Sequence, residues 1–208
     1  MSPESIVVQG LLPLSLHPVV GKLQLAGKGE EKMDKTLIKM KIAELEKKLE
    51  DVLDVLHPED YSEYLDYIDW LITKTDLFLK GRSFKKGKDY KKFGTFKRGD
   101  IVLVNFGYNV GTEKNKIRWA IVIDINNLPT FGTVTVVPLT TKQGRTVNHP
   151  TCVFVGHIPP LPSNKTYVDV GNIRSISKLR IMRTVGRANN DVLNAVDEKL
   201  KELFLGKY

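Results

Sequence analysis

The polar stretch Val110-Gly-Thr-Glu-Lys-Asn-Lys-Ile-Arg-Trp119 runs directly into the apolar segment Ala-Ile-Val-Ile123. A second apolar segment, Ile101-Val-Leu-Val104, precedes it by a few residues. Short runs rich in Val and Ile, separated by polar residues and glycine, are typical of β-strands joined by turns. The sequence therefore predicts two strands and a polar loop between them. This loop brings a carboxylate and an arginine to the edge of a buried strand, an arrangement that suits work on a phosphodiester.

The pattern of short strands continues beyond this pair. We expect strands at residues 101–106, 120–125, 134–139, 151–155 and 167–170, with a sixth at 180–185. Five or six short strands within ninety residues favour a small barrel. A final helix is predicted, which Asn189 or Asn190 caps and Gly206 ends. The expected fold is mainly β: an SH3-like small barrel over residues 97–208 with a C-terminal helix.

The region before the barrel has a different composition. Residues 1–32 contain scattered glycine and proline without a sustained period, which predicts a weakly structured extension. The purine-codable stretch Lys28–Lys32 lies just before Met33, so Met33 is a candidate natural start. Residues 33–80 carry an apolar seam at spacings of four and three that His57-Pro58 interrupts. This pattern predicts a helical hairpin or coiled-coil arm. Its role is open between dimerisation, docking of a partner, autoinhibition and a plain cap on the barrel.

Residues 81–96 form the expected boundary between the arm and the barrel. The segment is basic, contains glycine and interleaves aromatic side chains. Basic residues alternating with aromatics can grip a single nucleic-acid strand by charge and stacking. A flexible, solvated tether explains the same composition, and both interpretations stay open.

The charge of the 208-residue chain is divided between these regions. Residues 33–80 carry seven Lys and Arg against twelve Asp and Glu, a net charge of −5, whereas residues 81–208 carry 22 against 9, a net charge of +13. A basic region of this size attracts a polyanion such as RNA or DNA, although a solvated basic surface is the simpler alternative. A single cysteine, Cys152, fits a cytoplasmic protein, and no apolar run is long enough to span a membrane.

The residues that can carry chemistry lie in the polar loop and after a later strand. The four histidines do not cluster with Cys or Asp at ligand spacing, so we expect no metal and no cofactor. Metal-free RNA cleavage needs a proton acceptor for the 2′-hydroxyl and a group that stabilises charge on the phosphoryl oxygens. Arg118 suits the second task, because a guanidinium presents two parallel donors and stays charged. Glu113 can accept a proton, and Thr112 and Thr140 offer hydroxyls. A surface ion pair and a turn threonine are the simpler interpretations.

Several motifs in the same order resemble the MazF/PemK family of toxins. They are Arg98-Gly-Asp-Ile-Val-Leu-Val104, Gly111-Thr-Glu113, Arg118, Val137-Pro-Leu-Thr140 and Tyr167-Val-Asp-Val-Gly-Asn-Ile-Arg174. The resemblance covers residues 97–205 and implies an SH3-like barrel that forms a homodimer. It implies sequence-specific, metal-independent cleavage of single-stranded RNA (mRNA) through a 2′,3′-cyclic phosphate. It also implies a type II toxin–antitoxin system whose antitoxin has an acidic segment.

The resemblance assigns roles to residues of this chain. The implied catalytic residues are Arg118, Thr140 and Glu113. The substrate-binding positions are Thr112, Lys114, Trp119, Thr141, Gln143 and Arg174.

Three positions depart from the family pattern. Trp119 follows the arginine where the family has proline, Lys114 follows the glutamate where it has glutamine, and Gly171 stands where it has an acid. The missing carboxylate leaves an alternative open: a non-catalytic barrel that binds nucleic acid or a protein partner.

Overall fold

A computed structural model describes residues 35–87, 89–111, 113–125, 127–141, 150–163 and 165–206. The chain divides into two units, Met1–Val55 and Leu56–Tyr208. The extension at residues 1–32 and the candidate site residues Thr112 and Gln143 lie outside the described residues.

In the first unit, the apolar seam at spacings of four and three forms a helix, as predicted. Helix α1 spans Lys35–Leu53 and contains no buried residue. Its polar face carries pairs of opposite charge, among them Lys41 Nζ and Glu44 Oε2 at 2.6 Å. Exposed pairs of this kind add only a few tenths of a kcal/mol to a helix. The stability of α1 therefore depends on covering the apolar seam, and the dimerisation and docking roles of this arm stay predictions.

In the second unit, a proline sets the start of a long helix. His57 is extended, with φ −75° and ψ 147°, and Pro58–Asp60 forms the short helix η1. Helix α2 follows at Tyr61–Lys86. The predicted linker starts at residue 81, whereas the structure continues α2 through Lys86. The short helix η2, Tyr90–Phe93, comes next.

Aromatic packing also holds the segment after α2. Phe93 is buried, and its ring meets that of Phe84 edge-on at 5.4 Å between centroids. This contact anchors part of the predicted linker on the last turns of α2.

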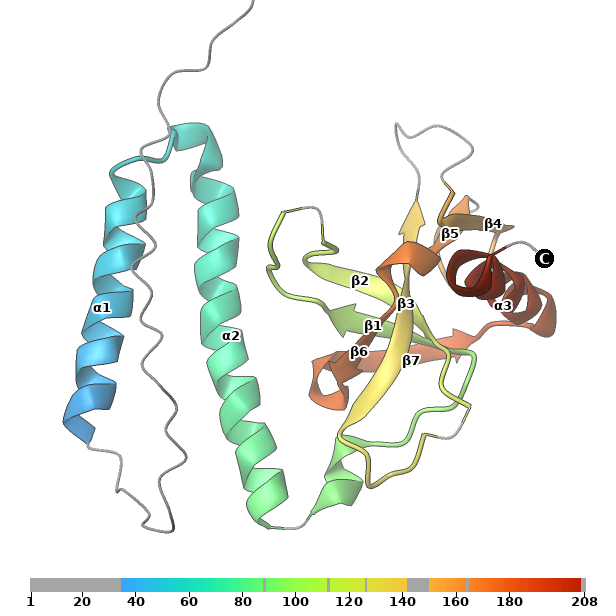
Figure 1. Cartoon of the computed structure of the whole chain (residues 1–208), viewed down its shortest axis with the longest axis horizontal. Coiled ribbons are helices and arrows are strands. Elements are labelled where there is room, and N and C mark those ends of the chain that lie inside the picture. The colour runs from blue at the N-terminus through green and yellow to red at the C-terminus, as the bar shows by residue number, and fades with distance from the viewer. Residues whose placement is uncertain are drawn as a thin grey trace, which may run out of the picture. The chain divides into compact units, whose positions relative to one another are not determined.

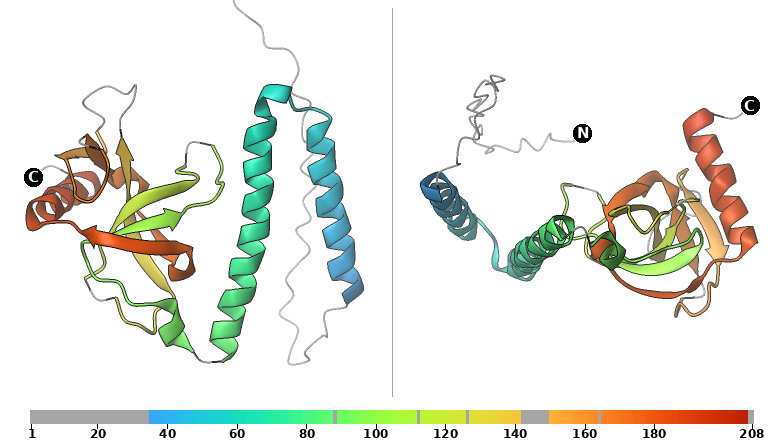
Figure 2. Two further views of the ribbon diagram at one scale, coloured as in Figure 1. Left: turned by 180° about the vertical axis from the view of Figure 1, so that it is seen from behind. Right: turned by 90° about the horizontal axis from the view of Figure 1, so that it is seen from below.

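The strands of the second unit form one antiparallel sheet that curls into a small barrel (Figures 1 and 2). They are β1 Asp100–Asn105, β2 Ile117–Val122, β3 Thr133–Thr141, β4 Cys152–Gly156, β5 Thr166–Asp169, β6 Arg174–Ser177 and β7 Ile181–Arg187. The order is β4-β5-β3-β2-β1-β7, and β6 pairs with β3. The predicted barrel is confirmed, and β6 is an additional strand. Short helices, η3 Val170–Asn172 and η4 Lys178–Arg180, flank β6.

The curled sheet has an apolar cluster on each face. Residues at alternate positions of β1 separate onto the two clusters: Ile101 belongs to one, and Val102 and Val104 to the other. This separation follows from the two-residue period of a strand. Helix α3, Asn190–Leu205, covers the first cluster with Val192 and Val196.

Polar contacts hold the start and the middle of α3. Asn189 is the N-cap, and its side chain accepts a hydrogen bond from the Val192 amide at 2.9 Å. Arg98 donates to the Ile123 carbonyl at 2.7 Å and to the carboxylate of Asp197. Gly206 follows the helix with a positive φ of 79°. The predicted cap and stop of the final helix are confirmed.

A buried lysine ties η4 to two irregular segments. Lys178 is 2% exposed, and its Nζ donates to the carbonyls of Leu128 at 2.9 Å and Gly94 at 3.1 Å. Burial lowers the pKa of this ammonium group. The carbonyl acceptors compensate in part for the lost hydration, so Lys178 is a structural residue of the barrel.

Candidate functional site

Strand register brings Arg118 of β2 near Thr140 of β3. The two strands pair antiparallel, with Ala120 opposite Pro138 and Val122 opposite Val136. Extrapolated by two residues, this register places Arg118 opposite Thr140 on the face that Ala120 and Pro138 share. The two strongest candidate residues therefore line the same cavity, although they lie 22 positions apart in the chain.

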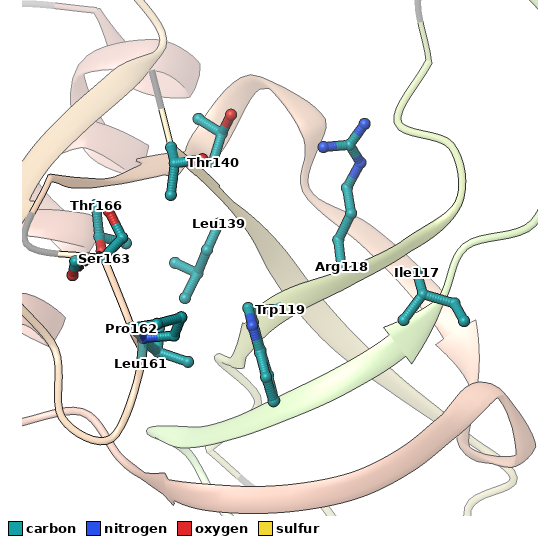
Figure 3. A pocket seen from close by; sticks show the side chains of 10 residues that line it. Ile117, Arg118, Trp119, Leu139, Thr140, Leu161, Pro162, Ser163 and Thr166 are labelled. Carbon is teal, nitrogen blue, oxygen red and sulfur yellow. Dashed lines mark hydrogen bonds between the residues drawn. The ribbon is translucent and has the colours of Figure 1, made fainter. Parts of the chain in front are cut away.

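A cavity of about 300 Å³ opens at this strand edge (Figure 3). Figure 3 shows the Arg118 guanidinium pointing toward the end of the cavity where Thr140 lies, and the Trp119 ring pointing the other way. Strands β2 and β3 supply one wall and the segment after β4 supplies the other. The lining residues are Ile117, Arg118, Trp119, Leu139, Thr140, Thr141, Leu161, Pro162, Ser163 and Thr166.

The loop between β1 and β2 orients Arg118. The Arg118 Nε donates to the Asn115 carbonyl at 2.7 Å. Asn115 is itself held, because its side-chain Oδ1 accepts from the Asn109 amide at 2.8 Å. One edge of the guanidinium is thus occupied, and the terminal nitrogens can meet a phosphate.

Trp119 stacks with a basic residue of a neighbouring strand. The Arg183 guanidinium lies over the Trp119 ring, 5.5 Å from its centroid. Trp119 of β2 and Arg183 of β7 both pair with Leu103 of β1. Their side chains therefore meet across that strand. A half-buried aromatic ring beside an arginine is suited to stacking a base of a single strand.

The structure holds Glu113 and Arg174 together outside the cavity. Arg174 Nη2 lies 2.8 Å from Glu113 Oε2. The Glu113 side chain is 52% exposed, so the carboxylate stays accessible while it is paired. Neither residue lines the cavity that contains Arg118 and Thr140. Arg174 follows Gly171 in the segment that departs from the family pattern.

Lys114 forms a buried ion pair and does not project into solvent. Its Nζ lies 2.8 Å from Asp169 Oδ2, and the two side chains are 11% and 2% exposed. Asp169 also accepts from the Asn172 side chain at 3.1 Å. Lys114 therefore ties the β1–β2 loop to the end of β5, and the structure does not bring it to the cavity.

The sequence alone did not identify the second wall of the cavity. Ser163 and Thr166 place hydroxyls near the candidate site, and Leu161 and Pro162 supply apolar surface. These residues lie in and after a loop without strand or helix periodicity. The one local signal is the Pro159-Pro-Leu-Pro162 run, which marks an irregular segment but gives no position in space.

Chemically, this arrangement can bind a phosphodiester. Arg118 supplies a fixed cation, Thr140 and Thr141 supply hydroxyls, and the Trp119 ring supplies a flat apolar surface. Among the described residues, no group of three His, Cys, Asp or Glu side chains is placed to hold a metal ion. The described helices include none that is long and apolar enough to cross a bilayer.

Comparisons with known proteins give the family of the barrel. Residues 97–204 match the family model of the PemK-like, MazF-like toxin of type II toxin–antitoxin systems. A search of the curated proteins finds no match.

Solved structures similar to this chain are about half its length. An endoribonuclease in complex with its cognate antitoxin from a mycobacterial species is 23% identical, with a TM-score of 0.44, and 55% of this chain covers 99% of that one. MazF from Deinococcus radiodurans is 25% identical, with the same TM-score and coverage. The Mycobacterium tuberculosis toxin MazF-mt6 is 21% identical, with a TM-score of 0.41, and 52% of this chain covers 99% of it.

The matched region contains every strand of the barrel and nearly all of α3, and it is more than half of the chain. The chain therefore belongs to the PemK-like, MazF-like family of toxins of type II toxin–antitoxin systems.

Proposed function

We propose that the protein is a sequence-specific endoribonuclease toxin that cleaves single-stranded RNA, mRNA in the cell, without a metal ion. The observation that carries the proposal is the cavity that Arg118 and Thr140 share, within a domain of the PemK-like, MazF-like toxin family. Residues 81–208, which include the barrel, carry a net charge of +13 that attracts the polyanion. We place this activity in the cytoplasm.

In the proposed reaction, the 2′-hydroxyl attacks the adjacent phosphorus. The bond to the 5′-oxygen breaks and this oxygen takes a proton from water, leaving a 2′,3′-cyclic phosphate and a 5′-hydroxyl. Arg118 stabilises the charge that develops on the phosphoryl oxygens, and Thr140 binds the scissile phosphate. Glu113 is the proposed proton acceptor, because its exposed carboxylate stands on the loop next to Arg118. Trp119 and Thr141 bind the substrate on the cavity wall.

Product analysis tests this chemistry. The full chain is incubated with single-stranded RNA in EDTA, and the fragment ends are identified by mass. We expect cyclic phosphate ends, and a single 2′-deoxy substitution at the cut position should prevent cleavage there. Cleavage that needs an added divalent ion, or that survives the 2′-deoxy substitution, contradicts the proposed mechanism.

One observation favours a second candidate function, RNA binding without cleavage. Arg174 holds Glu113 at 2.8 Å, and none of the lining residues of the cavity is a carboxylate. A barrel of this kind would retain affinity while lacking a proton acceptor. Tight, salt-dependent binding of RNA that stays intact over many hours would support this candidate and reject the first.

Two partners follow from membership in this toxin family. We propose that a cognate antitoxin binds the basic barrel through an acidic segment, and that the toxin acts as a homodimer. An acidic open reading frame next to the gene, whose product suppresses RNA cleavage when added in equal amounts, would support the first. Light scattering that gives the mass of one chain at micromolar concentration would contradict the second.

A further inference from the structure

Helix α2 contacts the β1–β2 loop, residues 106–116, through two side chains one turn apart. Trp70 is 6% exposed, and its ring lies against the backbone of Gly107. A Cβ at Gly107 would come within 2.1 Å of this ring, and Gly107 has a φ of +74°. Glycine is therefore required here both for space and for conformation.

The side chain of Arg180 also packs against the Trp70 ring. Its guanidinium lies 4.9 Å from the centroid of the Trp70 ring. The same guanidinium donates to the Phe106 carbonyl at 2.8 Å. Burial, and then the nearby charge of Arg174, lower the pKa of Arg180. Trp70 is thus enclosed between Gly107 of the loop and Arg180 of η4.

Asp66, one turn before Trp70, holds the end of the same loop. Its Oδ2 accepts from Lys116 Nζ at 3.0 Å and from the Tyr108 hydroxyl at 3.1 Å. Lys116 has a φ of +66°, the single described non-glycine residue with a positive φ. A long side chain adopts this conformation at a cost, so surrounding contacts must maintain it.

The backbone around Lys116 connects α2 to Arg118. The Lys116 amide donates to the Gly107 carbonyl at 2.7 Å, and the Phe106 amide donates to the Lys116 carbonyl at 3.0 Å. The residue before Lys116 is Asn115, whose carbonyl accepts from Arg118. A shift of Lys116 therefore moves the carbonyl that orients the guanidinium.

Helix α2 does not enter the Arg118 cavity. None of the residues that line that cavity belongs to α2. Residues of α2 line a separate cavity of about 380 Å³, which shares only Ile117 with the first. Contact with the loop, and not blockage of the cavity, is how α2 can influence the candidate site.

We propose that Asp66 and Trp70 are positioning residues, which hold the β1–β2 loop so that the Asn115 carbonyl orients Arg118. This inference rests on the proposed role of Arg118 and goes beyond it, since α2 precedes the region that matches the family model. Helix α2 is then part of the working site, although it contributes no group to the reaction.

Hydrogen exchange tests the structural part of the proposal independently of activity. Asp66→Asn in the full chain removes the charge that holds Lys116, while Asp76→Asn removes another exposed charge ten residues further along α2. We expect amide exchange in residues 106–117 to rise about fivefold or more in Asp66→Asn and to stay at the parent rate in Asp76→Asn. Equal exchange in both variants would overturn the proposal.

Kinetics test the consequence for Arg118. Asp66→Asn should lower kcat about tenfold to hundredfold with little change in KM, because a misplaced arginine weakens transition-state binding. Asp66→Glu should restore part of the rate, and Trp70→Phe should show a smaller loss. In an Arg118→Lys background the Asp66→Asn effect should disappear.

These measurements distinguish the proposed endoribonuclease function from the proposed positioning role of α2. A parent protein that cleaves no RNA rejects the proposed function, while the exchange measurement still decides whether α2 fixes the loop. If Asp66→Asn loosens the loop and kcat equals that of Asp76→Asn, the positioning role is rejected and the endoribonuclease assignment stands.

Discussion

Lys114 and Gly171 stand where the family pattern has other residues, and the structure gives both a packing role. A Cβ at Gly171 would lie 2.7 Å from the Thr151 Cβ, so a side chain does not fit there without movement. The carboxylate of this segment is instead at Asp169, two residues earlier, where Lys114 neutralises it at 2.8 Å. The two departures therefore have separate packing reasons: Gly171 lies against Thr151, and Lys114 pairs with Asp169.

Replacing Lys114 tests that connection. Lys114→Met keeps most of the side-chain volume but leaves Asp169 buried without its cation, which should destabilise the fold by about 3–5 kcal/mol. Urea unfolding measures the change, with the exposed Lys165→Met as the control. A loss below about 1 kcal/mol, the scale of a surface pair, would contradict the buried pair.

The pH dependence of Asp66 is a second prediction for a single residue. Hydrogen bonds from Lys116, and then from Tyr108, lower the pKa of the Asp66 carboxyl. A lowered folded-state pKa means that the stabilising contribution is complete above the ordinary aspartate value of about 3.9 and is lost as pH falls through the lower folded value.

The difference in Tm between the parent and Asp66→Asn should therefore be constant from pH 7 to about 5 and shrink below about pH 4. A difference that instead changes between pH 6 and 8 would mean that another group controls this contact.

Among the helices and strands, α3 was predicted best from its local sequence. Its N-cap, its buried stripe and its terminal glycine are all encoded within a few residues. Strand β6 was missed because its four residues follow η3 after a single residue, so the sequence shows no turn between them. The extension of α2 to Lys86 was missed because glycine and basic residues suggested a linker, whereas Phe84 in this part of α2 packs edge-on against the buried Phe93, a contact that local sequence does not reveal.

The cap of α3 gives a prediction with a built-in control. Asn189→Ala removes the acceptor of the Val192 amide and should cost about 1 kcal/mol, whereas the exposed neighbour Asn190 lies inside the first turn. Asn190→Ala should therefore be nearly neutral. Thermal unfolding of both variants measures the difference, and equal losses would contradict the assignment of the cap.

For the whole molecule, motif order predicted the barrel. Arg118 and Thr140 line one cavity because β2 and β3 are antiparallel neighbours. The partners of Glu113 and Lys114 could not be predicted. Arg174 lies 61 residues from Glu113, and that contact depends on how the loop closes. The contact between the Trp70 ring and Gly107 is likewise a tertiary contact that no local sequence pattern predicts.

The charge distribution of the whole chain predicts how RNA affinity depends on salt. If the basic barrel contacts about three phosphates, Kd should rise about tenfold to twentyfold between 50 and 200 mM salt. Fluorescence anisotropy with labelled single-stranded RNA measures this slope. A Kd that is nearly constant over this range would contradict electrostatic binding of RNA by the basic barrel.

The most direct test of the central claim is the single-turnover rate of RNA cleavage in EDTA by the full chain and two arginine variants. Arg118→Ala removes the cation of the cavity, and Arg187→Ala removes an arginine that pairs with Asp100 at 3.0 Å elsewhere on the barrel. The account predicts a loss of about a hundredfold or more for Arg118→Ala and a rate near that of the parent for Arg187→Ala. Equal rates for Arg118→Ala and the parent, or intact RNA with the parent itself, would contradict it.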